Sequence, residues 1–234
     1  MRLAAMADIH CRTNSTDLLR TLLDGIEDKA DLLALAGDLT DTGLPDEMEV
    51  LLEQLRHIQL PIVAVLGNHD HESDHAEELA KMLQDEGVCV LDGTVVEIQK
   101  VGFVGTKGFC GGFEDLFVQP FGERALKAFI QTSIDEAVRL ENALAKLDCE
   151  HRVAILHYAP IRGTLKGEPL ELYPFLGSSR LANAIDRHGA DVIFHGHAHH
   201  GSMQGFTKGN IPVHNVSRFV RTNYDHQPYC LFEV

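Results

Sequence analysis

Short apolar runs alternate with amphipathic stretches through the first third of the chain, and this order constrains the fold more than any other feature. Three runs have the length of buried strands: 3–7, 31–36 and 61–66. Leucines at helical spacing predict helices from a cap at Asn14 or Ser15 to about Asp28 and from about Asp74 to Glu86, with another between them that opens at Pro45 and Asp46 and carries apolar residues from Val50 to Leu55. This repeated strand–helix order predicts an α/β fold with parallel strands and right-handed crossovers.

The remaining chain mixes strands and helices less regularly. Short strands are expected over residues 88–105, with a hairpin turn at Asp92-Gly93, followed by a long helix over 120–147. Strands at 152–156 and 191–195 enclose a helix that Ser178 or Ser179 caps and Gly189 ends, and short strands with turns follow over 202–234. Without a linker or repeat, residues 1–234 are expected to form a single domain with two mixed sheets.

Polar clusters follow directly after the expected strands. They are Asp8-Ile9-His10, Gly37-Asp38-Leu39-Thr40-Asp41, Gly67-Asn68-His69-Asp70, His157 and Gly196-His197-Ala198-His199. In open α/β sheets the ligand crevice lies outside the carboxyl ends of the strands. Clusters that are far apart in the sequence are therefore expected to meet in one crevice.

The side chains of these clusters suit divalent metal ions. Imidazole together with carboxylate favours zinc, manganese, iron or nickel over a thiolate site. Asp38 is the natural carboxylate to bridge two ions, because its strand is expected to lie between the strands that supply the other ligands. The glycines before Asp38, Asn68 and His197 allow the backbone to turn sharply and to approach the site closely.

In order, the clusters read Asp-x-His, Gly-Asp, Gly-Asn-His-Asp, an isolated His and Gly-His-x-His. From Asp8 to His199 the sequence resembles the calcineurin-like metallophosphoesterases in each of these elements. Its Gly-Asp-Leu-Thr-Asp form looks most like the class III cyclic nucleotide phosphodiesterases and their small bacterial relatives. Protein serine/threonine phosphatases of the superfamily carry Gly-Asp-x-x-Asp-Arg-Gly, whereas Thr42 follows Asp41 here, which counts against a protein phosphatase.

The resemblance implies a four-layer αββα sandwich with two mixed β-sheets, as in other metallophosphoesterases. It also implies two divalent metal ions as cofactors: manganese, iron, zinc or nickel. The implied ligands are Asp8, His10 and His199 for one ion, Asn68, His157 and His197 for the other, and Asp38 for both.

The resemblance further implies hydrolysis of phosphoesters by a hydroxide that bridges the two metals. Two ions about 3.5–4 Å apart can clamp an in-line displacement at phosphorus. His69 takes the family role of donor to the phosphate or the leaving oxygen. A carboxylate would orient its ring. Asp41, which matches the family position, is the expected partner of His69. Asp70 is the alternative partner, although a carboxylate that only caps its loop fits its position equally well.

Three further side chains are candidates for binding the substrate. Arg12 follows His10 closely and has a guanidinium suited to phosphate, although a surface arginine at a helix start fits the pattern equally well. His71 adjoins Gly-Asn-His-Asp. Lys107 lies in the glycine-rich segment 105–113, which lacks the register of a P-loop. We interpret this segment as a flexible loop over the site, with a structural hairpin as the alternative.

Charge and composition restrict the partners. The formal net charge of -15 disfavours a nucleic-acid polymer, so the expected partner is a small phosphoester substrate. No apolar run approaches the length of a transmembrane span, and no membrane partner is expected. The five cysteines form no C-x-x-C pair, which favours a reducing environment and a cytoplasmic location.

The expected function is therefore the hydrolysis of small phosphodiesters. The alternatives are a broad phosphomonoesterase, a non-catalytic metal-binding scaffold on the same fold, and a nuclease. The full ligand set and His69 argue against the scaffold, and the acidic charge argues against the nuclease.

Overall fold

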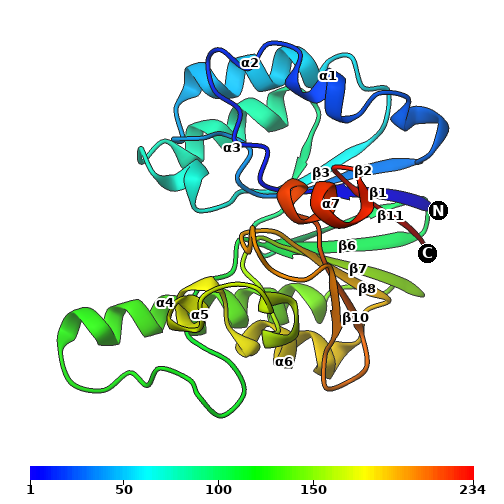
Figure 1. Cartoon of the computed structure of the whole chain (residues 1–234). Helices are drawn as coiled ribbons and strands as arrows, with labels where there is room; N and C mark the ends of the chain where they lie inside the picture. Colours follow the sequence, from blue (N-terminus) through cyan, green and yellow to red (C-terminus); the bar gives the residue numbers. More distant parts are fainter.

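The computed structural model describes all 234 residues, and two β-sheets packed face to face form its centre (Figure 1). The first sheet contains, in spatial order, β11 (Cys230–Glu233), β1 (Arg2–Met6), β2 (Leu32–Ala36), β3 (Ile62–Val65) and β4 (Cys89–Val90). The second contains β5 (Thr94–Ile98), β6 (Val101–Thr106), β7 (His151–Leu156), β8 (Val192–His195), β10 (Pro212–Asn215) and β9 (Gln204–Phe206). The inner strands run parallel and β11, β5 and β9 run antiparallel, so both sheets are mixed, as predicted.

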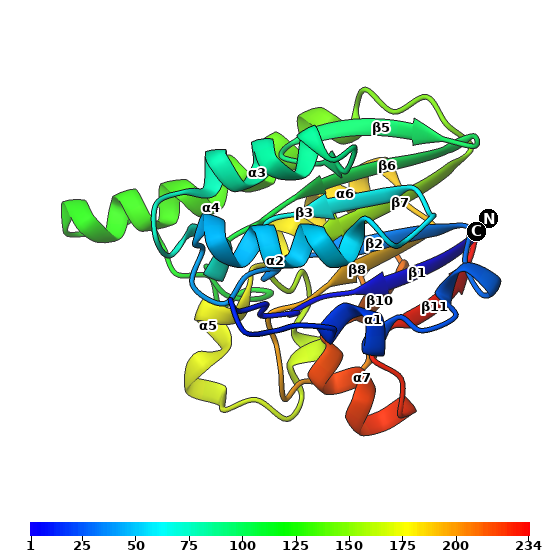
Figure 2. The same cartoon turned by 90° about the horizontal axis from the view of Figure 1, so that it is seen from above.

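Helices cover the outer faces of both sheets, which confirms the expected four-layer αββα arrangement (Figures 1 and 2). The first sheet is covered by α1 (Leu18–Leu22), the 3₁₀ turn η1 (Ile26–Asp28), α2 (Pro45–Leu55) and α3 (Ala76–Asp85). The second is covered by α4 (Arg124–Leu144) and α6 (Ser179–His188). The connections contain η2 (His69–His71), η3 (Arg162–Leu165), η4 (Leu170–Leu172), α5 (Tyr173–Leu176) and α7 (Arg218–Asp225). No helix combines the length and the apolar character needed to cross a membrane.

Three layers of apolar core hold these elements together. Alternate residues of a strand point to opposite faces of its sheet. In β1, Ala4 and Met6 therefore pack towards the outer helices, whereas Leu3 and Ala5 join the core that includes Phe103 of the second sheet. A third core lies between the second sheet, α4 and α6. Strands buried on both faces read as continuous apolar runs, which is why the sequence revealed them.

The first helix is shorter than predicted. The expected helix up to Asp28 is divided into α1 and η1, because Gly25 between them adopts the left-handed backbone conformation, with φ of 65°. Ser15 does not cap the helix. Its hydroxyl instead accepts a hydrogen bond from the main-chain N–H of Arg12 at 3.0 Å.

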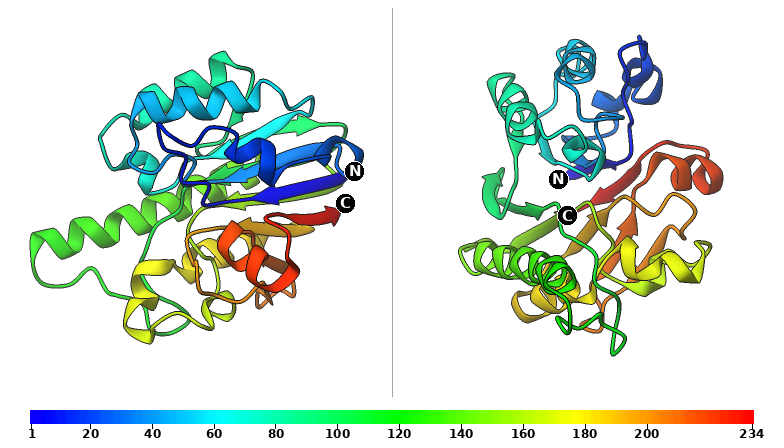
Figure 3. Two further views of the ribbon diagram at one scale, coloured as in Figure 1. Left: turned by 45° about the horizontal axis from the view of Figure 1, so that its top comes forward. Right: turned by 90° about the vertical axis from the view of Figure 1, so that its left-hand side faces the viewer.

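The second half holds one confirmed cap and one unexpected helix. Ser178 caps α6 as predicted, since its hydroxyl accepts the main-chain N–H of Arg180 at 3.3 Å. Helix α7, however, lies within 202–234, where only short strands were expected. Its buried residues are Val220 and Arg221, so it has too few apolar positions for a helical period to be recognised. In Figure 3, α7 lies beside the two sheets.

The glycine-rich segment 105–113 is packed into the protein, and the prediction of a flexible loop over the site is wrong. Residues 110–113 are buried. The main-chain N–H groups of Gly111 and Gly112 donate to the carbonyl oxygens of Pro174 and Gly177 at 2.8 and 3.0 Å. Lys107, directly after β6, is less buried than most of this segment, and its side chain lines a pocket.

Candidate metal centre

The side chains expected to bind metal lie together where parallel strands end. Residues after β1, β2 and β3 come from the first sheet: Asp8, His10, Asp38 and Asn68. Residues after β7 and β8 come from the second: His157, His197 and His199. The two sheets present their carboxyl ends on the same side of the molecule, so the crevice forms between them.

Two groups of potential metal donors share one carboxylate. Donor atoms of the first group all lie within 4.8 Å of one another: Asp8, His10, Asp38 and His199. The second group meets the same limit: Asp38, His157 and His197. The Oδ1 atom of Asn68 adjoins the second group, 2.9 Å from Nε2 of His157. The structure thus brings together the residues to which the family resemblance assigns ligand roles, and those roles stay a prediction.

The two carboxylate oxygens of Asp38 face opposite groups. Oδ1 lies 3.3 Å from Nε2 of His157, and it accepts the main-chain N–H of His69 at 2.8 Å. Oδ2 lies 3.8 Å from Nε2 of His10. This orientation follows from the strand order, because β2 lies between β1 and β3. Asp38 is thus positioned to donate one oxygen to each of two ions.

His157 and His10 each present one nitrogen to the centre and anchor the other. Nδ1 of His157 lies 3.0 Å from the carbonyl oxygen of Ala36, and Nδ1 of His10 lies 3.3 Å from the carboxylate of Asp41. Such outer partners fix the ring of a metal-binding histidine. The inward Nε2 of His10 is buried and has no hydrogen-bond partner in the protein. A divalent ion would satisfy this nitrogen, so the donor set fits the expected cofactors.

Buried negative charge also favours cations in this crevice. Burial alone would raise the pKa of Asp8, but hydrogen bonding and attraction from His199 lower that pKa well below its usual range. Burial opposes protonation of His157, yet the adjacent Asp38 raises the pKa of His157 to about 9. Both carboxylates are almost completely buried and need compensating positive charge, which divalent ions would supply.

Backbone strain is concentrated at the same residues. Asp8, His10, Asp38 and His197 all have left-handed conformations, with φ between 47° and 69°. A side chain held in a sparsely populated region costs about 1–3 kcal/mol, and such residues cluster at functional sites. The surrounding core therefore stabilises a backbone geometry that serves the centre rather than the local fold.

Two glycines permit the sheets to approach this closely. A Cβ atom on Gly37, which has φ of 85°, would lie 2.5 Å from Nδ1 of His157. A Cβ atom on Gly67 would overlap the carboxylate of Asp38. The prediction that glycines allow the backbone to reach the site is confirmed at both positions.

His69 lies at the edge of the centre with a free nitrogen. Its Nδ1 contacts the main-chain carbonyl oxygen of Asp41 at 2.6 Å, and its ring centre lies 4.5 Å from that of His10. The expected orienting contact from Asp41 thus comes from the main chain. The Asp41 carboxylate instead contacts His10 and, at 2.8 Å, Nε of Arg12. Because Nδ1 is occupied, Nε2 of His69 is the nitrogen available to a substrate.

Asp70 has the loop-capping role that was weighed as its alternative. Its buried carboxylate accepts main-chain N–H groups from Leu39, Thr40 and Gly67 at 3.2, 2.8 and 2.8 Å. It also accepts the Thr40 hydroxyl at 2.6 Å. Asp70 therefore joins the loops after β2 and β3 and holds the ligand-bearing turns in place.

We expect Asp70→Ala to reduce stability strongly, because it leaves several buried donors without an acceptor. Each unsatisfied buried donor costs about 1–3 kcal/mol, so the free energy of unfolding should fall by at least about 3 kcal/mol. Thermal and urea unfolding monitored by circular dichroism measure this loss. Asp115→Ala, at an exposed position, is the matched control and should change stability little. Equal stability of the two variants would contradict this role.

The candidate substrate residues occupy two sides of the centre. Arg12 is exposed at the mouth and is paired with Asp41. His71 and Lys107 line a pocket on the other side, between α3 and α4. Lys107 also supports the centre directly, since its carbonyl oxygen accepts the main-chain N–H of His157 at 3.1 Å.

Two residues of α7 contact members of the first group of donors, and no motif in the sequence indicated them. Nε of Arg218 donates to the main-chain oxygen of Asp8 at 2.9 Å. The guanidinium carbon lies 4.4 Å from the centre of the Phe219 ring, which is 4.6 Å from the His199 ring. Both residues lie outside the family motifs. The only sequence feature that could have indicated them is the position of Arg218, which follows shortly after the end of a strand, β10.

The fold and the shared cluster of aspartates and histidines define a metallophosphoesterase. The chain belongs to the calcineurin-like phosphoesterase family, whose model matches residues 1–201.

Curated relatives match parts of the chain. Purple acid phosphatase 4 of Arabidopsis thaliana is 26% identical over 164 residues, covering 67% of this chain and 45% of the relative. Glycerophosphodiester phosphodiesterase GpdQ of Enterobacter lignolyticus is 25% identical over 99 residues, covering 37% of this chain and 36% of the relative. The chain thus spans less than half the length of these two relatives.

Among solved structures, the phosphopantetheinyl hydrolase PptH of Mycobacterium tuberculosis has a similar fold. The TM-score is 0.70 with 16% sequence identity, and the match covers 98% of this chain and 95% of that protein. A similarity at this level of identity supports the architecture only.

Proposed function

We propose that this chain hydrolyses small phosphodiesters at a centre that holds two divalent metal ions. The observation that carries the proposal is the Asp38 carboxylate, which is shared by two donor groups and directs one oxygen to each. The residues proposed as ligands are Asp8, His10, Asp38, Asn68, His157, His197 and His199. Bound divalent ions would supply Lewis acidity to the phosphoryl oxygens and lower the pKa of a coordinated water.

The protein's own groups would position the ester and move a proton. His69 is about one-third exposed and presents Nε2, since Nδ1 is held by the carbonyl of Asp41. We propose that Nε2 donates a hydrogen bond or a proton to the phosphate or the leaving oxygen, a role that contributes roughly 10²–10⁴-fold in general acid catalysis. Asp41 would act as a positioning residue for His69, His10 and Arg12.

A broad phosphomonoesterase is the second candidate. The match to a purple acid phosphatase supports it, whereas the match to a glycerophosphodiester phosphodiesterase supports the first. The Gly-Asn-His-Asp motif and its Gly-Asp-Leu-Thr-Asp companion favour the diesterase, because they resemble the class III phosphodiesterases. A cytoplasmic location belongs to the proposal as well, supported by five cysteines that are all unpaired.

Metal-stripped protein should regain turnover when manganese, iron, nickel or zinc is added back singly. Initial rates with bis-p-nitrophenyl phosphate and p-nitrophenyl phosphate measure this, and we expect kcat/KM to be higher for the diester. A higher value for the monoester would favour the phosphomonoesterase. Failure of every metal to restore turnover of either ester, in protein that binds metal, would favour the non-catalytic scaffold.

A further inference from the structure

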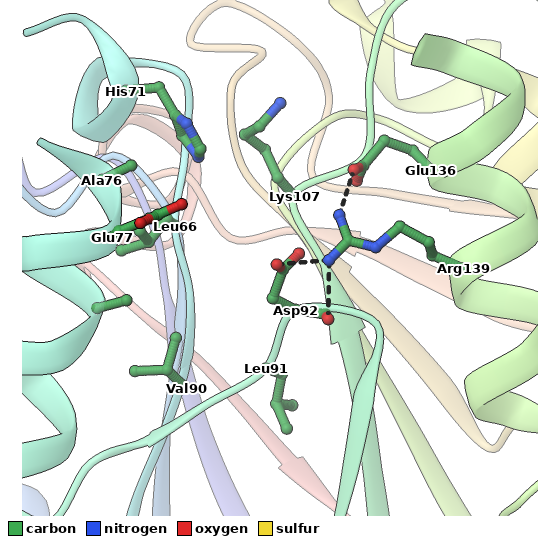
Figure 4. A pocket seen from close by; sticks show the side chains of 11 residues that line it. Leu66, His71, Ala76, Glu77, Val90, Leu91, Asp92, Lys107, Glu136 and Arg139 are labelled. Carbon is green, nitrogen blue, oxygen red and sulfur yellow. Dashed lines mark hydrogen bonds and ion pairs between the residues drawn. The ribbon is translucent and has the colours of Figure 1, made fainter. Parts of the chain in front are cut away.

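A pocket of about 160 Å³ opens between α3 and α4 (Figure 4). Leu66 and His71, which line it, flank the Gly-Asn-His-Asp motif on either side. Val90 and Leu91 form an apolar wall below them. The volume corresponds to about five water molecules, so the pocket has room for one small group and a short chain.

Lys107 is the cation of the pocket that forms no salt bridge, although Glu136 and Asp92 lie near enough to attract its charge. Both of these carboxylates pair instead with the guanidinium of Arg139, Asp92 at 2.5 Å and Glu136 at 3.0 Å. Glu136 also accepts the main-chain N–H of Gly108 at 2.9 Å. Lys107, in contrast, forms no salt bridge, and its ammonium donates only a long hydrogen bond of 3.3 Å to the carbonyl of Gly108. Figure 4 shows Nζ of Lys107 directed into the open space.

The environment of Lys107 makes this ammonium a site for an anion. Its Nζ lies 5.0 Å from the ring centre of Phe109 and 5.4 Å from that of Tyr158, so aromatic groups occupy positions where water would otherwise solvate it. Partial burial lowers the pKa of Lys107, which reports the cost of holding the charge there. Glu77 on the facing wall is exposed, and solvent therefore screens its negative charge.

Tyr158 places this ammonium within reach of the metal centre. Its ring lies 5.4 Å from Nζ of Lys107, and its ring centre lies 4.4 Å from that of His197. Nζ is therefore no more than about 10 Å from the His197 ring. This distance sets the length that one molecule needs to reach both sites.

We propose that this pocket binds a second anionic group of the substrate, carried by a short aliphatic chain on one alcohol of the phosphoester. The inference rests on the proposed phosphoesterase function and names the class of its substrate: an ester with a distal carboxylate or phosphate. Lys107 pairs with that anion, and the apolar wall contacts the chain.

Matched synthetic diesters test the proposal. The probes are p-nitrophenyl alkyl phosphates whose alkyl chains of varied length end either in a methyl group or in a carboxylate. The metal-loaded enzyme should hydrolyse the carboxylate series with higher kcat/KM, by roughly tenfold to a hundredfold at the best chain length, as expected for one charge-assisted hydrogen bond. Equal values for the two series at every length would overturn the inference while leaving the phosphodiesterase intact. No hydrolysis of either series would instead contradict the proposed diesterase function.

Substitution of Lys107 tests whether the preference for the carboxylate series arises in this pocket. Lys107→Met keeps the length and the aromatic contacts of the side chain, so the ratio of kcat/KM between the carboxylate and the methyl series should fall to about one. Lys107→Arg should retain part of the preference. Lys146→Met, at an exposed position on the chain after α4, is the control and should keep all of it. A preference that persists in Lys107→Met would show that the anion binds elsewhere.

Discussion

Asp38→Asn should remove metal-dependent turnover almost entirely. Asn tolerates the left-handed conformation at this position, with φ of 50°, so the substitution removes the shared negative charge with little change of backbone. Loss of an outer partner already weakens metal binding by about 10–100-fold. A shared inner ligand should cost more than about a hundredfold in affinity, and turnover should fall at least as far. Initial rates and equilibrium metal titrations measure the two effects.

The control for this prediction is Asp115→Asn, an exposed aspartate outside the crevice. It should bind metal and hydrolyse esters like the unmodified chain. Circular dichroism and thermal unfolding would establish that Asp38→Asn is folded. A folded Asp38→Asn protein with normal metal affinity and turnover would contradict the role assigned to this carboxylate.

His69→Ala should lower kcat by roughly 10²–10⁴-fold while metal content stays unchanged. The side chain is not among the proposed ligands, its ring lies 4.5 Å from that of His10, and Nε2 is the nitrogen left available once Nδ1 contacts Asp41. The expected loss should be larger for a poor leaving group such as an alkyl alcohol than for p-nitrophenol, because a good leaving group needs less protonation. Comparison of kcat for aryl and alkyl diesters measures this difference.

His57→Ala serves as the matched control, since His57 is exposed at the end of α2. It should leave both kcat and the dependence on leaving group unchanged. If His69→Ala instead lost metal in proportion to activity, His69 would be acting as a ligand. Undiminished kcat with every ester would remove its proposed catalytic role.

Much of the fold could be predicted from local sequence patterns, because strands buried on both faces appear in the sequence as apolar runs. The arrangement of β1, β2 and β3 was implied by their alternation with helices, and it correctly placed Asp38 between its neighbours. Helix ends were less predictable. They depend on single left-handed residues such as Gly25, whose conformation the hydrophobic pattern does not encode.

The sequence predicted which residues lie at the site, but it did not predict several of the contacts between them. Motif spacing grouped Asp8, Asp38 and His157 because each follows a strand. Spacing cannot show whether Asp41 meets His69 through its carboxylate or its carbonyl, since turn geometry decides this. The packing of α7, which brings Arg218 to Asp8, likewise depends on long-range contacts without a local signature.

The sequence also could not show that Lys107 forms no salt bridge. Lys107 and Arg139 are two cations in one pocket, and the difference between them lies in which carboxylates reach them. Asp92 and Glu136 both pair with Arg139 and leave Lys107 unpaired. Such a choice depends on the relative positions of β6, α4 and the turn after β4, which only the folded chain defines.

The most direct test of the central claim is manganese titration of metal-stripped protein, followed by electron paramagnetic resonance and elemental analysis. Two ions that share Asp38 at the separation typical of two-metal sites, about 3.5–4 Å, should be magnetically coupled. We predict two manganese ions per chain with a coupled spectrum, and loss of the coupling in Asp38→Asn. One ion per chain, or two ions without coupling, would contradict a binuclear centre built around Asp38.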